Sequence, residues 1–328
     1  SEQAPISGRE EGEFHYLEKR MKKHRIRGIG LEFKKNKFSY LFLLPATIYT
    51  LIFSYFTIPY MVIAFEDFKY NTGIHSQWVG LKNFSFFFSS TKAWEVTRNT
   101  LVLNISYLVV DTVIALVIAI LVNEIRKRKF AKLTQSAMLF PHFLSWVIIA
   151  YVLYAFLSSE YGLLNKMLTG VGMEAVNWYN NASYWPVILV IMHALKTAGY
   201  NSIVYLAAIT GIDSGIYEAA VIDGASTWKR IWYVTLPLLM PTVCILTLMS
   251  IGRIFYGDFA MYYAIVKDNG ILLKTTDVID TYVFRMLRTT GNPSMAMAIG
   301  VYQSVMGFLM VFGANWFTKK FFPEGALF

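Results

Sequence analysis

The sequence predicts an all-α, polytopic membrane protein with six transmembrane helices, and its composition and its apolar runs both support this prediction. Of the 328 residues, 55% are hydrophobic and only 16% are charged, a balance typical of membrane proteins. A helix needs about 20 apolar residues to cross the hydrocarbon core of a bilayer. Six stretches reach that length, at roughly 39–64, 99–122, 136–157, 184–209, 238–264 and 295–317. The third contains Pro141 and His142, which makes its ends the hardest to place.

The distribution of cations predicts which connecting segments face the cytoplasm, because cytoplasmic loops carry an excess of Lys and Arg. With the N-terminus inside, the cytoplasmic segments hold 19 such residues and the external segments hold 8. The cytoplasmic segments are then 1–38, 123–133, 210–237 and 318–328, and the external segments are 65–97, 158–183 and 265–294. We therefore expect both termini in the cytoplasm, and the net charge of +9 reflects topology.

This topology divides the chain into three parts. A basic tail at 1–38 precedes a six-helix transmembrane domain at 39–317, and a short cytoplasmic tail follows at 318–328. The first tail has no apolar core of the kind that a cleavable signal peptide requires. Apolar residues intersperse its cations, so we expect part of it to lie on the bilayer as an amphipathic helix. The alternative is a solvated tail before about residue 14. A nucleic-acid partner is not favoured, because the cations directly precede a span.

A polar, basic loop at 211–237 separates the fourth and fifth apolar runs and is the most specific feature of the chain. Asp213 or Ser214 can cap a short helix, and Gly224 can end it. A second helical turn can begin at Ser226 or Thr227. Glu218 is expected in the first turn of the short helix and Pro237 at the first position of the next long helix. The pattern predicts a helix-turn-helix at the membrane surface.

This loop resembles the cytoplasmic signature of the membrane subunits of ATP-binding-cassette importers, in which Glu-Ala-Ala is followed by Gly and by an Ile-x-Leu-Pro ending. Val234 departs from the Ile of that ending by one methylene. The resemblance implies a coupling helix that docks in a groove of a separate ATPase subunit, with Glu218 in polar contact and Gly224 at the turn. The residues assigned to coupling are Glu218, Ala219, Ala220, Asp223, Gly224, Leu236 and Pro237.

Other segments are similar to carbohydrate permeases and extend the resemblance from about residue 38 to 320. Residues 78–84 (WVGLKNF), Asn99-Thr100, residues 161–165 (YGLLN) and residues 206–209 (LAAI) match elements of that family. The basic tail and residues 275–282 look closest to the subgroup that moves oligosaccharides from polysaccharides such as alginate and pectin. The resemblance implies a type I importer permease fold in a bacterial inner membrane. It also implies four kinds of partner: a second, homologous permease, two ATPase copies, an external solute-binding protein and an oligosaccharide.

Motifs that the chain lacks exclude several functions. It has no Gly-x-x-x-x-Gly-Lys-Ser/Thr phosphate loop, so we expect ATP and Mg to be bound by the partner ATPase subunits and this chain to be non-catalytic. The five histidines show no spacing typical of metal ligands, and Cys244 is the single cysteine. We therefore expect no cofactor, metal or disulfide in this chain. An intramembrane enzyme is the weaker alternative.

Polar residues inside the predicted spans indicate the substrate path, because such residues are costly in lipid and face protein or water. The candidates are His193, Lys196, Tyr200 and Asn201 in the fourth span and Arg253, Tyr256 and Tyr263 along one stripe of the fifth, with Asn104, Asp111 and Gln303 completing the polar inventory. Aromatic rings can stack on the apolar faces of sugar rings, and charged and amide groups can bind the hydroxyls.

Each candidate also has a structural alternative. Lys196 and Arg253 could pair with Asp111 or Asp258, or lie near an interface, and the aromatic stripes could be packing residues. Lys196 and Arg253 nevertheless lie in the two spans that flank the coupling loop, and together with the subgroup resemblance this favours acidic oligosaccharides. A neutral oligosaccharide and, less favoured, an ion-coupled secondary carrier are the alternatives that the sequence leaves open.

Overall fold

The computed structural model describes residues 35–125 and 127–321. The chain divides into two compact units, Ser1–Met61 and Val62–Phe328. The predicted amphipathic segment of the basic tail falls on residues 1–34 and lies outside the described residues, as does the end of the C-terminal tail from residue 322.

The first unit contributes most of one long apolar helical segment, Lys37–Phe65, which is long enough to cross a membrane. It comprises α2 (Lys37–Thr50), the π-helical turn η1 (Leu51–Tyr55) and the 3₁₀ helix η2 (Ile58–Phe65), whose last residues belong to the second unit. Pro45 lies inside α2 and cannot donate a backbone hydrogen bond. No residue of α2 is buried, so its apolar side chains are free to face lipid or another chain.

Within the described residues, five helical segments are long and apolar enough to span a membrane, and a bent pair of helices brings the number to six if it counts as one span. Besides Lys37–Phe65, the segments are Thr91–Asn123, Ala182–Thr210, Thr227–Ile251 and Pro293–Lys320. They contain α4 (Thr91–Asn123), η4 (Ala182–Tyr184), α8 (Trp185–Thr210), α10 (Thr227–Arg230), η5 (Ile231–Thr235), α11 (Leu236–Ile251) and α15 (Pro293–Phe321). The predicted all-α membrane fold is confirmed.

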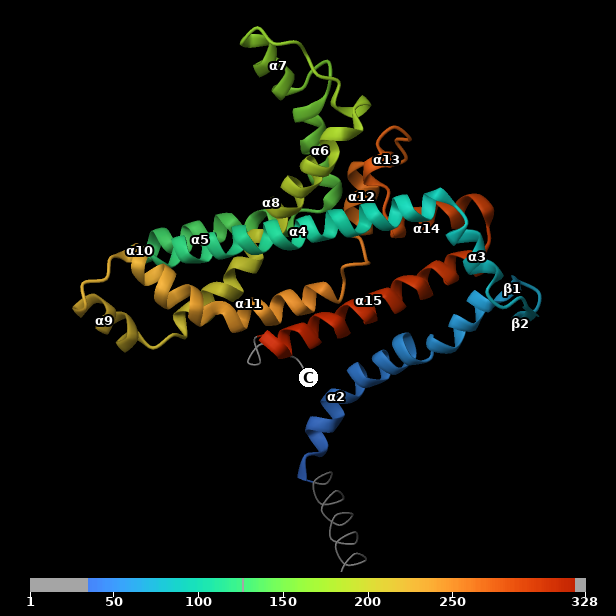
Figure 1. The fold of residues 1–328 in the computed structure, drawn as a ribbon, viewed down its shortest axis with the longest axis horizontal. Helices are drawn as coiled ribbons and strands as arrows, with labels where there is room; N and C mark the ends of the chain where they lie inside the picture. Colours follow the sequence, from blue (N-terminus) through green and yellow to red (C-terminus); the bar gives the residue numbers. More distant parts are fainter. Residues whose placement is uncertain (1–34, 126, 322–328) are drawn as a thin grey trace, which may run out of the picture. The chain divides into compact units, whose positions relative to one another are not determined.

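The third predicted span, 136–157, is broken in its middle. Helices α5 (Arg128–Phe143) and α6 (Trp146–Leu157) are inclined by 97° at the break. Pro141 lies in the last turn of α5, and Ser145 caps α6 by accepting a hydrogen bond from the Ile148 N–H at 3.3 Å. The helix α6 consequently points away from the direction of α4 and α5 and carries α7 (Leu163–Gly170) at its far end (Figure 1).

The prediction of a continuous fifth span at 238–264 is wrong. Helix α11 ends at Ile251, a non-helical stretch covers 252–258, and the short helix α12 begins at Phe259 and ends at Ile265. Arg253, Tyr256 and Tyr263 therefore do not share a helical stripe.

Side chains from three other elements hold the break at 252–258. The Asn104 amide of α4 donates to the carbonyls of Ile254 (2.7 Å) and Tyr256 (3.1 Å). The Gln303 amide of α15 donates to the Phe255 carbonyl at 2.9 Å. The Gly257 N–H donates to Asp280 Oδ2 at 2.6 Å, from α14 (Ile279–Thr290). Backbone groups that leave a helix need such partners when they are shielded from water, and here they find them far away in the sequence.

The segments predicted to be external contain the short elements. Strands β1 (Glu66–Lys69) and β2 (Gly73–Trp78) form an antiparallel hairpin that is followed by α3 (Lys82–Phe88). The later segments contain α7, η3 (Trp178–Asn180), α13 (Leu273–Thr276) and α14. The buried Asn83 amide donates to the carbonyls of Ala64 and Glu66 and ties α3 to the end of η2. This contact gives the Trp78–Phe84 motif a structural role.

The core of the second unit is built on α4 and α8, which pack along each other. Their largest buried side chains include Trp185 and Leu103, which meet Tyr262 of α12 in one cluster. Gly199 of α8 lies against α5 so closely that an added Cβ atom would stand 2.1 Å from the Met138 carbonyl oxygen. Helices α5 and α8 thus touch backbone to backbone at this point.

Candidate functional site: a coupling loop and a polar cavity

The loop between α8 and α11 folds as the predicted helix-turn-helix. Helix α9 (Ser214–Ile222) is capped by Asp213, whose carboxylate accepts from the Gly215 N–H at 2.9 Å. Gly224 has a φ of +75°, the left-handed conformation that ends many helices and favours glycine. Ser226 then caps α10 by accepting from the Lys229 N–H.

Two details of the predicted loop are corrected. Glu218 lies in the second turn of α9, because the helix begins at Ser214. Pro237 does not start a helix: α10, η5 and α11 form one continuous helical segment, Thr227–Ile251. The π-helical turn η5 directly precedes α11, where Pro237 stands at the second position. A π-turn changes the hydrogen-bond spacing locally, which accommodates a residue that has no N–H to donate.

Helix α9 presents an exposed surface at one end of the second unit, opposite the β1–β2 hairpin (Figure 1). None of its residues is buried, and Ile222 is 85% exposed. The Tyr217 hydroxyl lies 3.0 Å from the Thr235 hydroxyl, so α9 is attached to the start of the fifth span. The predicted coupling residues Glu218 and Ala219 are exposed and free to meet a partner chain.

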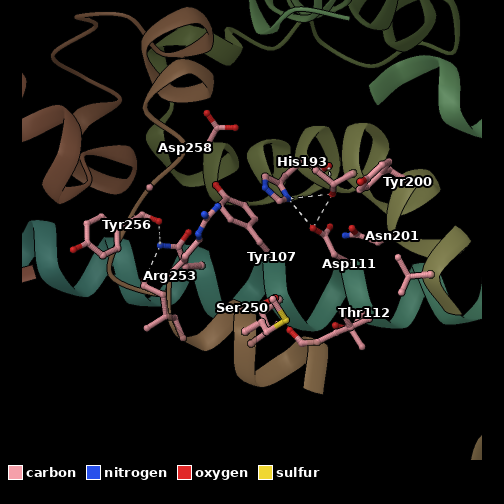
Figure 2. Close-up of a pocket in the computed structure, with 18 of the residues that line it drawn as sticks. Tyr107, Asp111, Thr112, His193, Tyr200, Asn201, Ser250, Arg253, Tyr256 and Asp258 are labelled. Carbon is pink, nitrogen blue, oxygen red and sulfur yellow. Dashed lines mark hydrogen bonds and ion pairs between the residues drawn. The ribbon is translucent and has the colours of Figure 1, made fainter. Parts of the chain in front are cut away.

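A cavity of about 900 Å³ lies between α4, α5, α8, α11 and the break at 252–258. Five predicted substrate-path residues line it: His193, Tyr200, Asn201, Arg253 and Tyr256 (Figure 2). Lys196 and Tyr263 are absent from its lining. Five of the seven predicted substrate-path residues therefore line one cavity, and the other two do not.

The cavity wall contains a buried acid–imidazole pair. Asp111 Oδ2 lies 2.8 Å from His193 Nδ1 and accepts a hydrogen bond of 2.8 Å from the Thr197 hydroxyl. The ring of Tyr107 stacks on His193, with centroids 4.4 Å apart. The Tyr107 and Tyr262 hydroxyls lie 2.9 Å from each other, which joins α4 to α12. This network fixes the Asp111 carboxylate and the imidazole in place.

Among the described residues, two buried polar atoms of the cavity lining have no hydrogen-bond partner: Asp111 Oδ1 and His142 Nδ1. The His142 ring stacks on Tyr200 with centroids 4.3 Å apart. Sequence reasoning named neither His142 nor Tyr107 as a cavity residue. A signal existed for Tyr107, which stands four residues before Asp111 and so shares its face of α4.

Arg253 lines the cavity as an exposed side chain. Its guanidinium makes no ion pair or hydrogen bond with any residue that the structure describes, so the predicted alternative of pairing with Asp111 or Asp258 does not occur. Asp258 instead accepts from the Trp146 indole N–H at 2.6 Å and caps α12 through the Met261 N–H at 3.1 Å. Arg253 is thus a cation with open donors inside the cavity.

The Lys196 ammonium is hydrogen-bonded to backbone carbonyl groups. Its ammonium donates to the His142 carbonyl at 2.8 Å and to the Leu144 carbonyl, both at the break between α5 and α6. It also lies 5.2 Å from the centroid of the Trp146 ring. Among the described residues the ammonium makes no ion pair with a carboxylate, so the predicted pairing with Asp111 or Asp258 does not occur. The predicted contact of Lys196 with substrate stays a prediction.

The two predicted tyrosines of the fifth span have separate surroundings. Tyr256 lines the cavity, and its hydroxyl lies 2.9 Å from the Ser304 hydroxyl of α15. Tyr263 lies on α12 and packs with Phe259 and Phe284, at centroid distances of 5.3 and 5.4 Å. The packing alternative therefore describes Tyr263.

Comparison with known proteins gives the family. The model of the family described as "binding-protein-dependent transport system inner membrane component" matches residues 111–323. Protein LplB of Bacillus subtilis (strain 168) is 34% identical over 293 residues, covering 89% of this chain and 92% of that protein. The polygalacturonan/rhamnogalacturonan transport system permease protein YteP of the same organism is 33% identical over 305 residues, covering 93% and 94%.

Solved structures agree with these relatives. A bacterial ABC transporter involved in the import of the acidic polysaccharide alginate contains a chain that matches with a TM-score of 0.80 and 30% identity, over 89% of this chain and 98% of that one. A bacterial alginate ABC transporter in complex with an alginate pentasaccharide-bound periplasmic protein matches with a TM-score of 0.79 and 30% identity, over 88% and 96%.

The fold and these relatives define a multi-pass, non-catalytic permease subunit of an ABC importer. The chain belongs to the family of inner membrane components of binding-protein-dependent transport systems.

Proposed function

We propose that this permease forms the translocation path of an ATP-driven importer of oligosaccharides, and that its α9 docks on a separate ATPase. A second, homologous permease, two ATPase copies that bind ATP and Mg, and an external solute-binding protein complete the assembly. The exposed surface of α9 supports the contact with the ATPase. The family's dependence on binding proteins supports the external solute-binding protein as a partner. The cation distribution supports both termini lying in the cytoplasm of a bacterial cell.

We further propose that the transported oligosaccharides are acidic. One observation carries this proposal: Arg253 enters the cavity with its guanidinium unpaired among the described residues. A guanidinium presents a planar fork of donors that matches a carboxylate. Two similar proteins point the same way: YteP is a polygalacturonan/rhamnogalacturonan transport permease, and the similar solved structure is involved in the import of the acidic polysaccharide alginate.

Uptake of uronate oligomers into proteoliposomes that contain the complete importer tests the substrate class. In Arg253→Met, we expect uptake of an acidic oligomer to lose at least about tenfold in apparent affinity, because a charge-assisted pair is removed. A neutral oligomer of equal length is the matched substrate control, and its uptake should not change. Equal loss for both oligomers, or a larger loss in Tyr256→Ala than in Arg253→Met for the acidic one, would favour neutral sugars instead.

Purification tests the partners. The detergent-solubilised permease should carry an ATP-binding subunit and a second permease with it. We expect Glu218→Lys, which inverts an exposed charge on α9, to insert normally and to lose the ATPase while the second permease stays bound. Isolation of the wild-type chain alone, with transport that needs no ATP, would identify an ion-coupled carrier.

A further inference from the structure

Two helix breaks lie beside the cavity, and one lysine of α8 contacts the first of them. The break between α5 and α6 covers residues 144–145, and the break between α11 and α12 covers 252–258. The last turn of α5 leaves carbonyl groups without helical partners, as every helix end does. The C-terminal end of a helix also attracts a cation through its dipole.

Lys196 supplies both a hydrogen-bond donor and a positive charge to the C-terminal end of α5. Its ammonium donates to the carbonyls of His142 and Leu144, and its charge lies over the ring of Trp146, the first residue of α6. A cation over an indole face is stabilised by the ring quadrupole, most strongly where water is excluded. The Trp146 residue is 8% exposed. Lys196 thus holds both sides of the bend.

The same Trp146 indole also contacts the second break, between α11 and α12, through its N–H. The Trp146 N–H donates to Asp258 Oδ2 at 2.6 Å, and Asp258 Oδ1 caps the first turn of α12. A chain of three side chains, Lys196, Trp146 and Asp258, therefore links α8 to both breaks. We refer to these three residues as the helix-break bridge.

Helix α8 connects the helix-break bridge to the coupling loop. It runs without interruption from Trp185 to Thr210, and α9 begins four residues later. One turn after Lys196, Gly199 presses backbone to backbone on α5 at Met138. Helix α8 therefore gives an uninterrupted helical connection from the start of the coupling loop to α5 and the helix-break bridge.

We propose that Lys196 is a positioning residue for transport: through the helix-break bridge it keeps the two breaks of the cavity wall in register with α8, so that α9 and the wall move together. In this proposal Lys196 contacts the backbone at the α5–α6 break and does not bind the substrate itself. Coupling between distant sites requires a physical element that both sites bias, and the bridge supplies that element. The inference rests on the proposed docking of α9 on an ATPase.

The test uses the complete importer in proteoliposomes and compares ATP hydrolysis with uptake. In Lys196→Met, which keeps the length and removes the charge, we expect hydrolysis without the loaded binding protein to rise roughly tenfold and uptake per ATP to fall by a similar factor, given the loss of two charge-assisted hydrogen bonds. The substrate concentration for half-maximal uptake should stay unchanged. Lys196→Arg, which keeps donors and charge, should recover part of the coupling.

Three further variants make the outcome decisive. Trp146→Phe keeps an aromatic ring under the ammonium and removes the N–H that donates to Asp258. It should therefore lower uptake per ATP, as Lys196→Met does, but to a smaller extent. It replaces Lys196→Met in the test if that variant does not assemble. Lys319→Met removes an exposed cation at the end of α15 and should behave as wild type. Arg253→Met should weaken the apparent affinity for substrate, which Lys196→Met should leave unchanged.

Wild-type coupling in both Lys196→Met and Trp146→Phe would overturn the inference, and so would a weaker apparent substrate affinity with intact coupling in Lys196→Met. Failure of the proposed function gives a different result, because the wild-type importer itself would then show no ATP-dependent uptake.

Discussion

Asp111 and His193 join α4 to α8 inside the cavity, with Oδ2 and Nδ1 2.8 Å apart and the carboxylate almost fully buried. Thr197 donates to the same oxygen, so one carboxylate oxygen holds two groups of α8. A buried polar group that loses its partner costs about 1–3 kcal/mol. Asp111→Ala should therefore lower the melting temperature of the purified complex clearly, and Asp111→Asn, which keeps an acceptor, should lower it less. Equal melting of both variants and the wild type would contradict this role.

Gly199 should tolerate no side chain. An alanine Cβ there would stand 2.1 Å from the Met138 carbonyl oxygen, which is backbone, so α5 and α8 would have to separate. Overpacking of this kind typically costs about 1–3 kcal/mol. We expect Gly199→Ala to reduce the thermal stability of the complex. The matched control is Gly313→Ala in α15, where an added Cβ meets nothing within 4 Å and alanine favours the helix.

The turn after α9 should require a residue that accepts the left-handed conformation. Gly224 has a φ of +75°, which costs most L-residues roughly 1–2 kcal/mol and asparagine less. Gly224→Ala should reduce uptake per ATP, Gly224→Pro should abolish coupling without preventing insertion, and Gly224→Asn should retain most of it. Gly211→Ala serves as the control in the same loop, because its backbone is right-handed and its added Cβ makes only ordinary contacts. Normal coupling in Gly224→Pro would refute the assignment of the loop.

Asp280 should make stability depend on pH. Burial raises the pKa of its carboxyl above the ordinary 3.8, against the opposing hydrogen bonds from the Gly257 N–H and the Gln303 amide. The folded protein therefore binds this proton more tightly than the unfolded chain does. The stability that follows is complete below the unfolded pKa and is lost as pH rises through the folded pKa. Melting curves from pH 4 upward should show the wild type losing stability relative to Asp280→Asn, and parallel curves would contradict this.

The sequence predicted those parts of the structure that depend on local signals. The caps at Asp213 and Ser226 and the turn at Gly224 are short-range patterns, and the structure confirms each of them. Four of the six predicted apolar runs also coincide with continuous helical segments, as their apolar length alone predicts. His193, Tyr200 and Asn201 were found because polar residues within a span must face protein or water.

The misplaced elements depend on contacts that no local pattern encodes. The break at 252–258 interrupts an apolar run, and its backbone is satisfied by Asn104, Asp280 and Gln303, which lie far away in the chain. The partners of Lys196 are carbonyl groups, which every residue possesses, so its role could not be read from side-chain types. Tyr263 left the predicted stripe because the predicted helix is interrupted at 252–258 and Tyr263 lies on the separate helix α12.

The break at 252–258 is held by side chains of α4, α14 and α15 at once, and this limits which substitutions the stretch and its partners tolerate. A loop with free ends accepts replacement one residue at a time, whereas this stretch functions as a joint with three attachments. A saturation scan should find Asn104, Asp280 and Gln303 far less replaceable than their exposed neighbours, and grafting residues 252–258 alone into a related permease should fail unless these three residues are transferred with them.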